Sequence, residues 1–139
     1  MDPGMAATIG HLMSLDPAVI AEARELVVAA GLKAFQAAAA TPPSTGGQPV
    51  AIALIDCGSR DPGTPNFDNP DPDRPGVLRS RSILEAVHAG IALPPVVLFQ
   101  AAGDTRYELI AGFHRFHLWA ALGYTHVPAE ISNWKFGMP

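Results

Sequence analysis

The chain contains 139 residues, of which 48% are hydrophobic, and it has a formal charge of -4 at pH 7 and a mean hydropathy of +0.18. This length predicts one domain with one core, and the hydrophobic content excludes an intrinsically disordered chain. The acidic balance argues against broad, unspecific binding to nucleic acid, which requires a basic surface.

The first clear element is a helix in "LDPAVIAEARELVVAAG" (15–31). Asp16 is a suitable N-cap, and Pro17 suits the first helical position. Ile20 and Val27 share one apolar face, which predicts a helix that buries one side. Gly31 is expected to end this helix.

The next residues predict less regular structure. "LKAFQAAAA" (32–40) indicates a second short helix, and "TPPSTGGQP" (41–49) indicates a linker because Pro and Gly interrupt regular structure. We therefore separate an N-terminal helical segment and linker, residues 1–49, from a domain of residues 50–131. Residues 132–139 form a C-terminal tail.

The domain is expected to begin with "VAIALI" (50–55), a continuous apolar run that predicts a strand covered on both faces. A long loop rich in Pro, Gly and Asp follows over 56–76, and loops of this length are often functional. "SRSILEAVHAG" (80–90) predicts a helix, in which Ser82 and Glu85 match a capping box.

The C-terminal half predicts a hairpin, a helix and a final strand. The hairpin joins "PPVVLFQ" (94–100) to "RYELIAG" (106–112) through a Gly-Asp turn. The helix covers 113–122 and the last strand 126–131. The whole order predicts an α+β domain with a small mixed sheet and packed helices, preceded by the N-terminal helical segment.

The transition from strand to helix in "IAGFHRFHLWAALG" (110–123) has the features of an anion site. Gly112 lets the backbone approach a ligand closely, and the first helical N–H groups lack internal partners at the positive end of the helix dipole. Such an end binds phosphate, to which Arg115 adds a planar fork and His114 a further donor. The alternative is an ordinary helix start with two basic side chains in solvent.

The segment 107–131 resembles the core of the ParB/sulfiredoxin superfamily. ParB members have a glycine, an acidic residue and two basic residues here, followed by a helix, a second glycine and a Val-Pro strand, whereas sulfiredoxins have Gly-Cys-His-Arg. The matching residues are Gly112, His114, Arg115, Gly123, Val127 and Pro128. "GIALPPVVLF" (90–99) is similar to the family's glycine-stopped helix and Pro-initiated strand, and "NPDPDR" (69–74) resembles the Asn-Pro…Arg box of ParB proteins.

This resemblance implies a ParB/sulfiredoxin-like fold and a nucleotide site. In sulfiredoxins the His-Arg pair holds ATP phosphates, and in ParB proteins the matching box holds CTP. The resemblance therefore implies a bound nucleotide, ATP or CTP with Mg²⁺. In the family, the start of the helix that here covers residues 80–89 faces the nucleotide from the other side. Arg74, Arg79 and Arg81 precede or open this helix, and a surface charge cluster is the alternative for them. The implied phosphate-binding residues are Gly112, Phe113, His114, Arg115, Arg74, Arg79 and Arg81.

Two departures from the family limit the chemistry. Phe113 occupies the position of the sulfiredoxin cysteine and of the ParB acidic residue, which excludes sulfinic-acid reduction by that route and argues against CTP hydrolysis. Cys57 is expected to be an inert thiol. Glu108 is the one candidate general base, with a surface strand residue as the alternative.

No metal site is expected from the protein's side chains alone. His114 and His117 are three residues apart, without the spacing of a zinc protease and without an apparent third ligand. Five aspartates between residues 56 and 73 could contribute to a magnesium–nucleotide site, or they could simply belong to a solvated loop.

The interpretation we favour is a nucleotide-binding ParB-like module, a switch or accessory factor of plasmid, phage or chromosome partition type. One alternative is a nucleotide-dependent phosphotransferase or nuclease-like enzyme of the same superfamily. Another is a non-catalytic interaction domain whose site has decayed. No helix-turn-helix region follows residue 131, so we expect no operator binding through this chain alone.

The sequence also predicts a compartment and partners. The single cysteine cannot form an intramolecular disulfide, no apolar run has the length of a membrane span, and no basic segment precedes an apolar one at the N-terminus. We expect a cytoplasmic protein without a membrane partner. The apolar helix face predicts contact with the domain or with a second copy, as a homodimer through residues 15–40.

Overall fold

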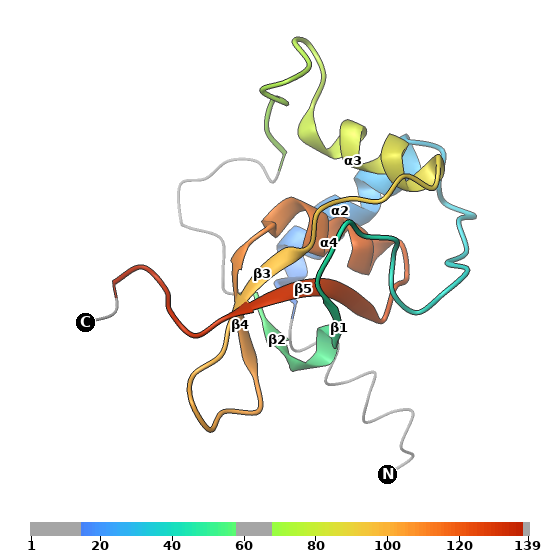
Figure 1. The fold of residues 1–139 in the computed structure, drawn as a ribbon. Helices are drawn as coiled ribbons and strands as arrows, with labels where there is room; N and C mark the ends of the chain where they lie inside the picture. The colour runs from blue at the N-terminus through green and yellow to red at the C-terminus, as the bar shows by residue number, and fades with distance from the viewer. Residues whose placement is uncertain (1–14, 58–67, 138–139) are drawn as a thin grey trace.

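A computed structural model of the chain describes residues 15–57 and 68–137 (Figure 1). Within these ranges the chain forms an α+β fold, as predicted. Three α-helices pack together beside a curled, five-stranded mixed sheet. The helices are α2 (Pro17–Ala29), α3 (Arg79–His88) and α4 (Phe113–Ala121).

The sheet has the strand order β1-β5-β3-β4-β2. Its strands are β1 (Gln48–Ala51), β2 (Ile55–Asp56), β3 (Val96–Phe99), β4 (Tyr107–Ala111) and β5 (His126–Ser132). The predicted hairpin is confirmed, because β3 and β4 pair antiparallel with Leu98 opposite Leu109. β5 runs parallel to β3 and antiparallel to β1, and β2 runs parallel to β4.

The prediction of a single strand over residues 50–55 is wrong. The chain leaves β1, makes a short 3-10 helix (Ile52–Leu54) and continues into β2, at the opposite edge of the sheet. This turn lets both Ile52 and Ile55 point into the core, where each is fully buried. The guanidinium of Arg106 fixes the turn by donating to Ala53 O at 3.2 Å.

Helix α2 forms as its sequence predicts, and it packs on α4 within the same chain. The Asp16 carboxylate accepts hydrogen bonds from Ala18 N at 2.9 Å and from Val19 N at 3.3 Å. The face that carries Ile20 and Val27 is buried in the core shared by the sheet and the other helices. Packing against α4 thus accounts for this apolar face.

The predicted second helix over residues 32–40 is not formed. Instead, the Phe35 ring packs on Tyr124 with ring centroids 6.1 Å apart. Ala40 O accepts the backbone N–H groups of Thr125 at 3.2 Å and His126 at 3.1 Å. These tertiary contacts replace helical hydrogen bonds, and they override the helix propensity of an alanine-rich segment. β1 begins at the end of the predicted linker.

The predicted capping box of Ser82 and Glu85 is also wrong, because α3 already begins at Arg79. Two aspartates from the preceding segment, rather than residues of the helix, accept hydrogen bonds at the start of α3. The Asp68 carboxylate accepts from Ser80 N at 3.0 Å and from Ser80 Oγ, and Asp71 accepts from Ser82 Oγ at 2.6 Å. A Ser-x-x-Glu spacing therefore occurs here inside the helix, and the segment 68–74 packs against its first turns.

The position of α2 in the core gives a testable expectation from two adjacent valines. Val27 is 6% exposed and Val28 is 54% exposed. Val27→Asp should lower the free energy of unfolding by about 3–5 kcal/mol because it buries a charge, whereas Val28→Asp should change it by less than about 0.5 kcal/mol. Urea titrations followed by circular dichroism would measure both. Equal stability of the two variants would show that α2 is not part of the core.

Candidate functional site

The conformation of Gly112 determines how β4 continues into α4. This glycine is the N-cap of α4 and has a left-handed backbone with φ of 93°. A Cβ atom here would lie 2.7 Å from Val96 Cγ1 and 3.0 Å from the Arg115 Nη2 atom. Only glycine therefore fits both the backbone angle and the space, and its small size lets Arg115 fold back against the end of the strand.

A cavity of about 240 Å³ lies between the starts of α3 and α4 and the segment 71–73. Four of the residues expected at the phosphate site from one helix start, Gly112 to Arg115, line this cavity together with one residue from the other helix start, Arg79. The remaining lining residues are Asp71, Pro72, Asp73, Ser82, Ile83, Leu93 and Pro94.

Two guanidinium groups meet at this cavity, and the charge of one of them, Arg79, helps to lower the pKa of Asp71 on the opposite wall. Arg115 Nη2 donates to Pro95 O at 3.2 Å, but the Nε atoms of Arg115 and Arg79 are buried and have no hydrogen-bond partner among the described residues. Burial, and secondarily the charge of Arg79, lowers the pKa of Arg115. Unpaired buried donors cost about 1–3 kcal/mol each, so this arrangement disfavours the fold and favours an anionic ligand.

The first turn of α4 supplies further donors. The first intrahelical hydrogen bond runs from Phe116 N to Gly112 O at 2.9 Å. The backbone N–H groups of the three preceding residues therefore have no partner within the helix. The His114 ring lies beside them, with its Nε2 atom 3.5 Å from Asn69 Nδ2.

The side chain of Phe113 is an aromatic packing element. Its ring lies 4.4 Å from that of His117, measured between centroids. His117 is fully buried, with Nδ1 2.8 Å from Phe113 O, so the two histidines of this helix do not share a site. Among residues 15–57 and 68–137, no group of three or more His, Cys, Asp or Glu side chains is arranged to hold a metal ion.

Two carboxylates line the wall of the cavity that the segment 71–73 forms. Hydrogen bonds from Ser82 Oγ and from the backbone N–H of Asp73 lower the pKa of Asp71, so its carboxylate is ionised at neutral pH. Asp73 lines the same wall. Both acids are among the five aspartates between residues 56 and 73 that the sequence offered for a magnesium–nucleotide site.

Arg74 and Arg81, which were also expected at the phosphate site, lie outside the cavity. Both donate to the carboxylate of Glu85, at 2.9 Å and 3.0 Å respectively. Of the three arginines near the start of α3, only Arg79 lines the cavity. Helical spacing accounts for this difference, because residues 79 and 81 lie on different faces of α3.

Glu108 and Cys57 also lie away from the cavity. Glu108 accepts a hydrogen bond from Lys135 Nζ at 2.6 Å and lines a separate hollow with Asp56 and Arg106. Cys57 is half-buried, and burial raises the pKa of its thiol, which favours the unreactive protonated form. Neither residue is positioned to act on a group held by Arg79 and Arg115.

The chain has no match among protein-family models, curated proteins or solved structures. No helix of the described residues has the length and apolar character needed to cross a bilayer. The functional argument therefore depends on the geometry of this cavity.

Gly112 provides a direct test of the local geometry. Gly112→Ala should destabilise the fold by about 1–3 kcal/mol more than Gly103→Ala, because both positions have positive φ but only Gly112 lacks space for a Cβ atom. Gly103 has nothing within 4 Å of the added Cβ and serves as the matched control. Thermal and urea unfolding would measure the difference, and equal losses would contradict the close packing described here.

Proposed function

We propose that this protein is a phosphate-binding module whose ligand is a nucleotide. The observation that carries the proposal is the convergence of two guanidiniums, Arg79 and Arg115, on one cavity at the start of α4, with the Nε donors of both buried and unpaired. A phosphate group would accept these donors. It would also gain from the positive end of the helix dipole.

Each residue at the start of α4 has a distinct role in this proposal. Gly112 leaves space for the ligand, and its left-handed backbone turns the chain from β4 into α4. Phe113 contributes its backbone N–H rather than a reactive side chain. His114 supplies a donor at the edge of the cavity, and Arg115 supplies the planar fork. Arg79 adds a second cation from α3, and Arg74 and Arg81 are not included.

A divalent cation fits the opposite wall. Mg²⁺ is usually held by one or two carboxylates together with substrate phosphates, and Asp71 and Asp73 line the cavity that Arg79 and Arg115 also line. These two aspartates would therefore hold Mg²⁺ only when a phosphorylated ligand supplies further oxygen atoms. The cation would neutralise the phosphate oxygens that face the acidic wall.

The resemblance of residues 107–131 to the ParB/sulfiredoxin superfamily supports ATP or CTP as the ligand and a role as a switch or accessory factor of partition type. Binding without chemistry is favoured over phosphotransfer or nuclease activity because Glu108 lies in another hollow and Phe113 offers no nucleophile. The cavity, with the buried and unpaired Nε donors of Arg79 and Arg115, argues against a decayed site.

Arg115→Ala should weaken nucleotide binding by about 10- to 150-fold, because each charge-assisted hydrogen bond contributes roughly 1.5–3 kcal/mol. Arg79→Ala should have a comparable effect, and Arg115→Lys should recover only part of the affinity. The free energy of unfolding should not fall in Arg115→Ala, since the substitution removes a half-buried cation that lies beside another cation. Calorimetric titrations with ATP and with CTP, alongside thermal melts, would measure these changes.

Arg24→Ala is the matched control for this series, because Arg24 is an exposed residue of α2 and does not line the cavity. Its affinity should remain within about twofold of wild type, as expected for a surface substitution away from the ligand. Absence of binding by wild type to every nucleotide, or equal affinities for wild type and Arg115→Ala, would remove the phosphate site.

The enzyme alternative has its own test. Incubation of the protein with Mg²⁺ and ATP or CTP should release no phosphate above the level of the Arg115→Ala variant, because Glu108 lies away from the cavity and the proposal assigns Asp71 and Asp73 to the cation. Phosphate release that requires Arg115 would contradict a pure binding module and would establish an enzyme. Malachite-green detection over several hours gives the required sensitivity.

A further inference from the structure

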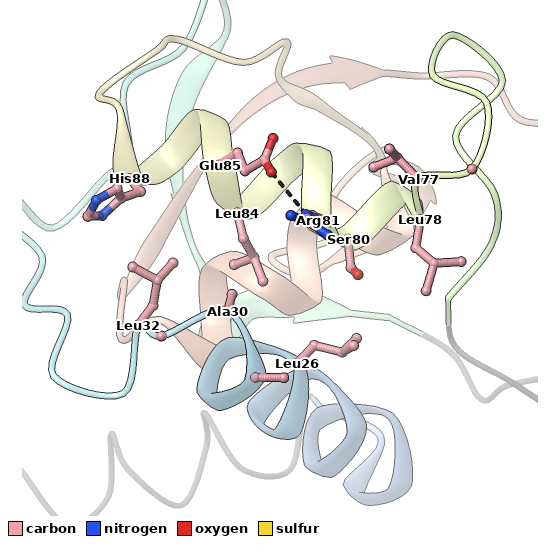
Figure 2. Close-up of a pocket in the computed structure, with 13 residues that line it drawn as sticks. Leu26, Ala30, Leu32, Val77, Leu78, Ser80, Arg81, Leu84, Glu85 and His88 are labelled. Atoms are coloured by element: carbon pink, nitrogen blue, oxygen red, sulfur yellow. Dashed lines mark hydrogen bonds and ion pairs between the residues drawn. The ribbon is translucent and has the colours of Figure 1, made fainter.

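A second cavity, of about 620 Å³, lies between the C-terminal end of α2 and the length of α3 (Figure 2). Its inner wall is apolar and includes Leu26, Leu32 and Leu84, while Leu78 stands at its edge with 48% of its surface exposed. This second cavity is larger than the phosphate cavity, and no residue lines both of them. It is an open apolar groove on the surface of the protein.

The groove exists because of the way the helices pack. α2 and α3 both lie against α4, but they make few contacts with each other. The apolar side chains between them are therefore covered by α4 on one side, and none of the described helices or strands covers them on the other. Leaving such surface in water is unfavourable by about 25 cal/mol per Å², which favours a partner that covers it.

The charges beside the groove indicate which partner fits. Arg81 and Glu85 lie one helical turn apart on α3, have 72% and 48% of their side-chain surface exposed, and pair at 3.0 Å (Figure 2). If two copies of α3 lie antiparallel across a two-fold axis, Arg81 of each copy faces Glu85 of the other. The Arg81–Glu85 pair is therefore complementary to the same pair in a second copy, while each Glu85 also accepts from Arg74 of its own copy at 2.9 Å.

We propose that the groove between α2 and α3 is a self-association surface, in which α3 of a second copy packs beside α2 to form a two-fold symmetric dimer. Helix α3 forms a ridge beside the groove. When a second copy is related by a two-fold rotation, α3 of each copy enters the groove of the other. Of the expected homodimer contact at residues 15–40, the proposal keeps the end of α2, and it adds α3, which the sequence did not suggest.

No residue lines both the groove and the phosphate cavity. Arg79, Ser82 and Ile83 face the phosphate cavity, whereas Arg81, Leu84 and Glu85 face the groove. Glu85 accepts from Arg74, which also donates to Ser82 Oγ, so a change at Glu85 reaches the wall of the phosphate cavity. Arg81→Glu is therefore the variant in which the oligomeric state and the nucleotide affinity are compared.

Charge reversal gives a sharp test. Arg81→Glu and Glu85→Arg should each raise the dimer dissociation constant by at least about 30-fold, because each places like charges opposite one another twice across the interface. An equimolar mixture of the two variants should associate with near wild-type affinity, since one copy then offers two carboxylates and the other two guanidiniums. Sedimentation velocity over a range of concentrations would measure all three.

Two further variants complete the experiment. Leu78→Glu should dissociate the dimer by placing a charge at the edge of the groove, while Phe136→Glu, at a side chain 95% exposed on the C-terminal tail, should leave it unchanged. Thermal melts would confirm that each variant is folded. A monomeric wild type, failure of the mixed variants to associate, or dissociation by Phe136→Glu would overturn the proposal.

Discussion

The cavity at the start of α4 and the groove between α2 and α3 both depend on the position of α4, which Gly112 sets through its left-handed backbone. The strand β4 enters the helix without a connecting loop, so the first turn of α4 lies directly against Val96 at the end of β3. Phe116 and Trp119 then anchor the helix in the core, where both are fully buried. α2 and α3 pack on this helix and leave the apolar groove between them.

Helix α3 contributes to both cavities because of its periodicity. Residues 79, 82 and 83 face the phosphate cavity, and residues 80, 81, 84, 85 and 88 face the groove. The helix has little freedom at its start, because Asp68 accepts the backbone N–H and the hydroxyl of Ser80. The segment 68–74 thus fixes the helix that supplies Arg79, and it supplies the acidic wall as well.

The sequence predicted those elements whose signals are local. Pro17 and Asp16 fix the start of α2, and the hydrophobic periodicity after Gly112 fixes α4. It did not predict the break at Ile52 in "VAIALI", because a continuous apolar run carries no period that distinguishes a strand from a turn. It also could not separate Arg79 from Arg74 and Arg81, since their roles depend on the position of Glu85 in space.

The cavity at the start of α4 leaves two buried donors without acceptors among the described residues. The Nε atoms of Arg79 and Arg115 are buried without hydrogen-bond partners, although Asp71 and Asp73 line the same cavity. The Asp71 carboxylate accepts hydrogen bonds from Ser82 Oγ and from the Asp73 backbone N–H, and the charge of Arg79 contributes to its lowered pKa. This acid therefore offsets part of the Arg79 charge but accepts from neither Nε atom. A ligand with phosphate oxygens would supply the missing acceptors, which is why the proposal depends on these two donors.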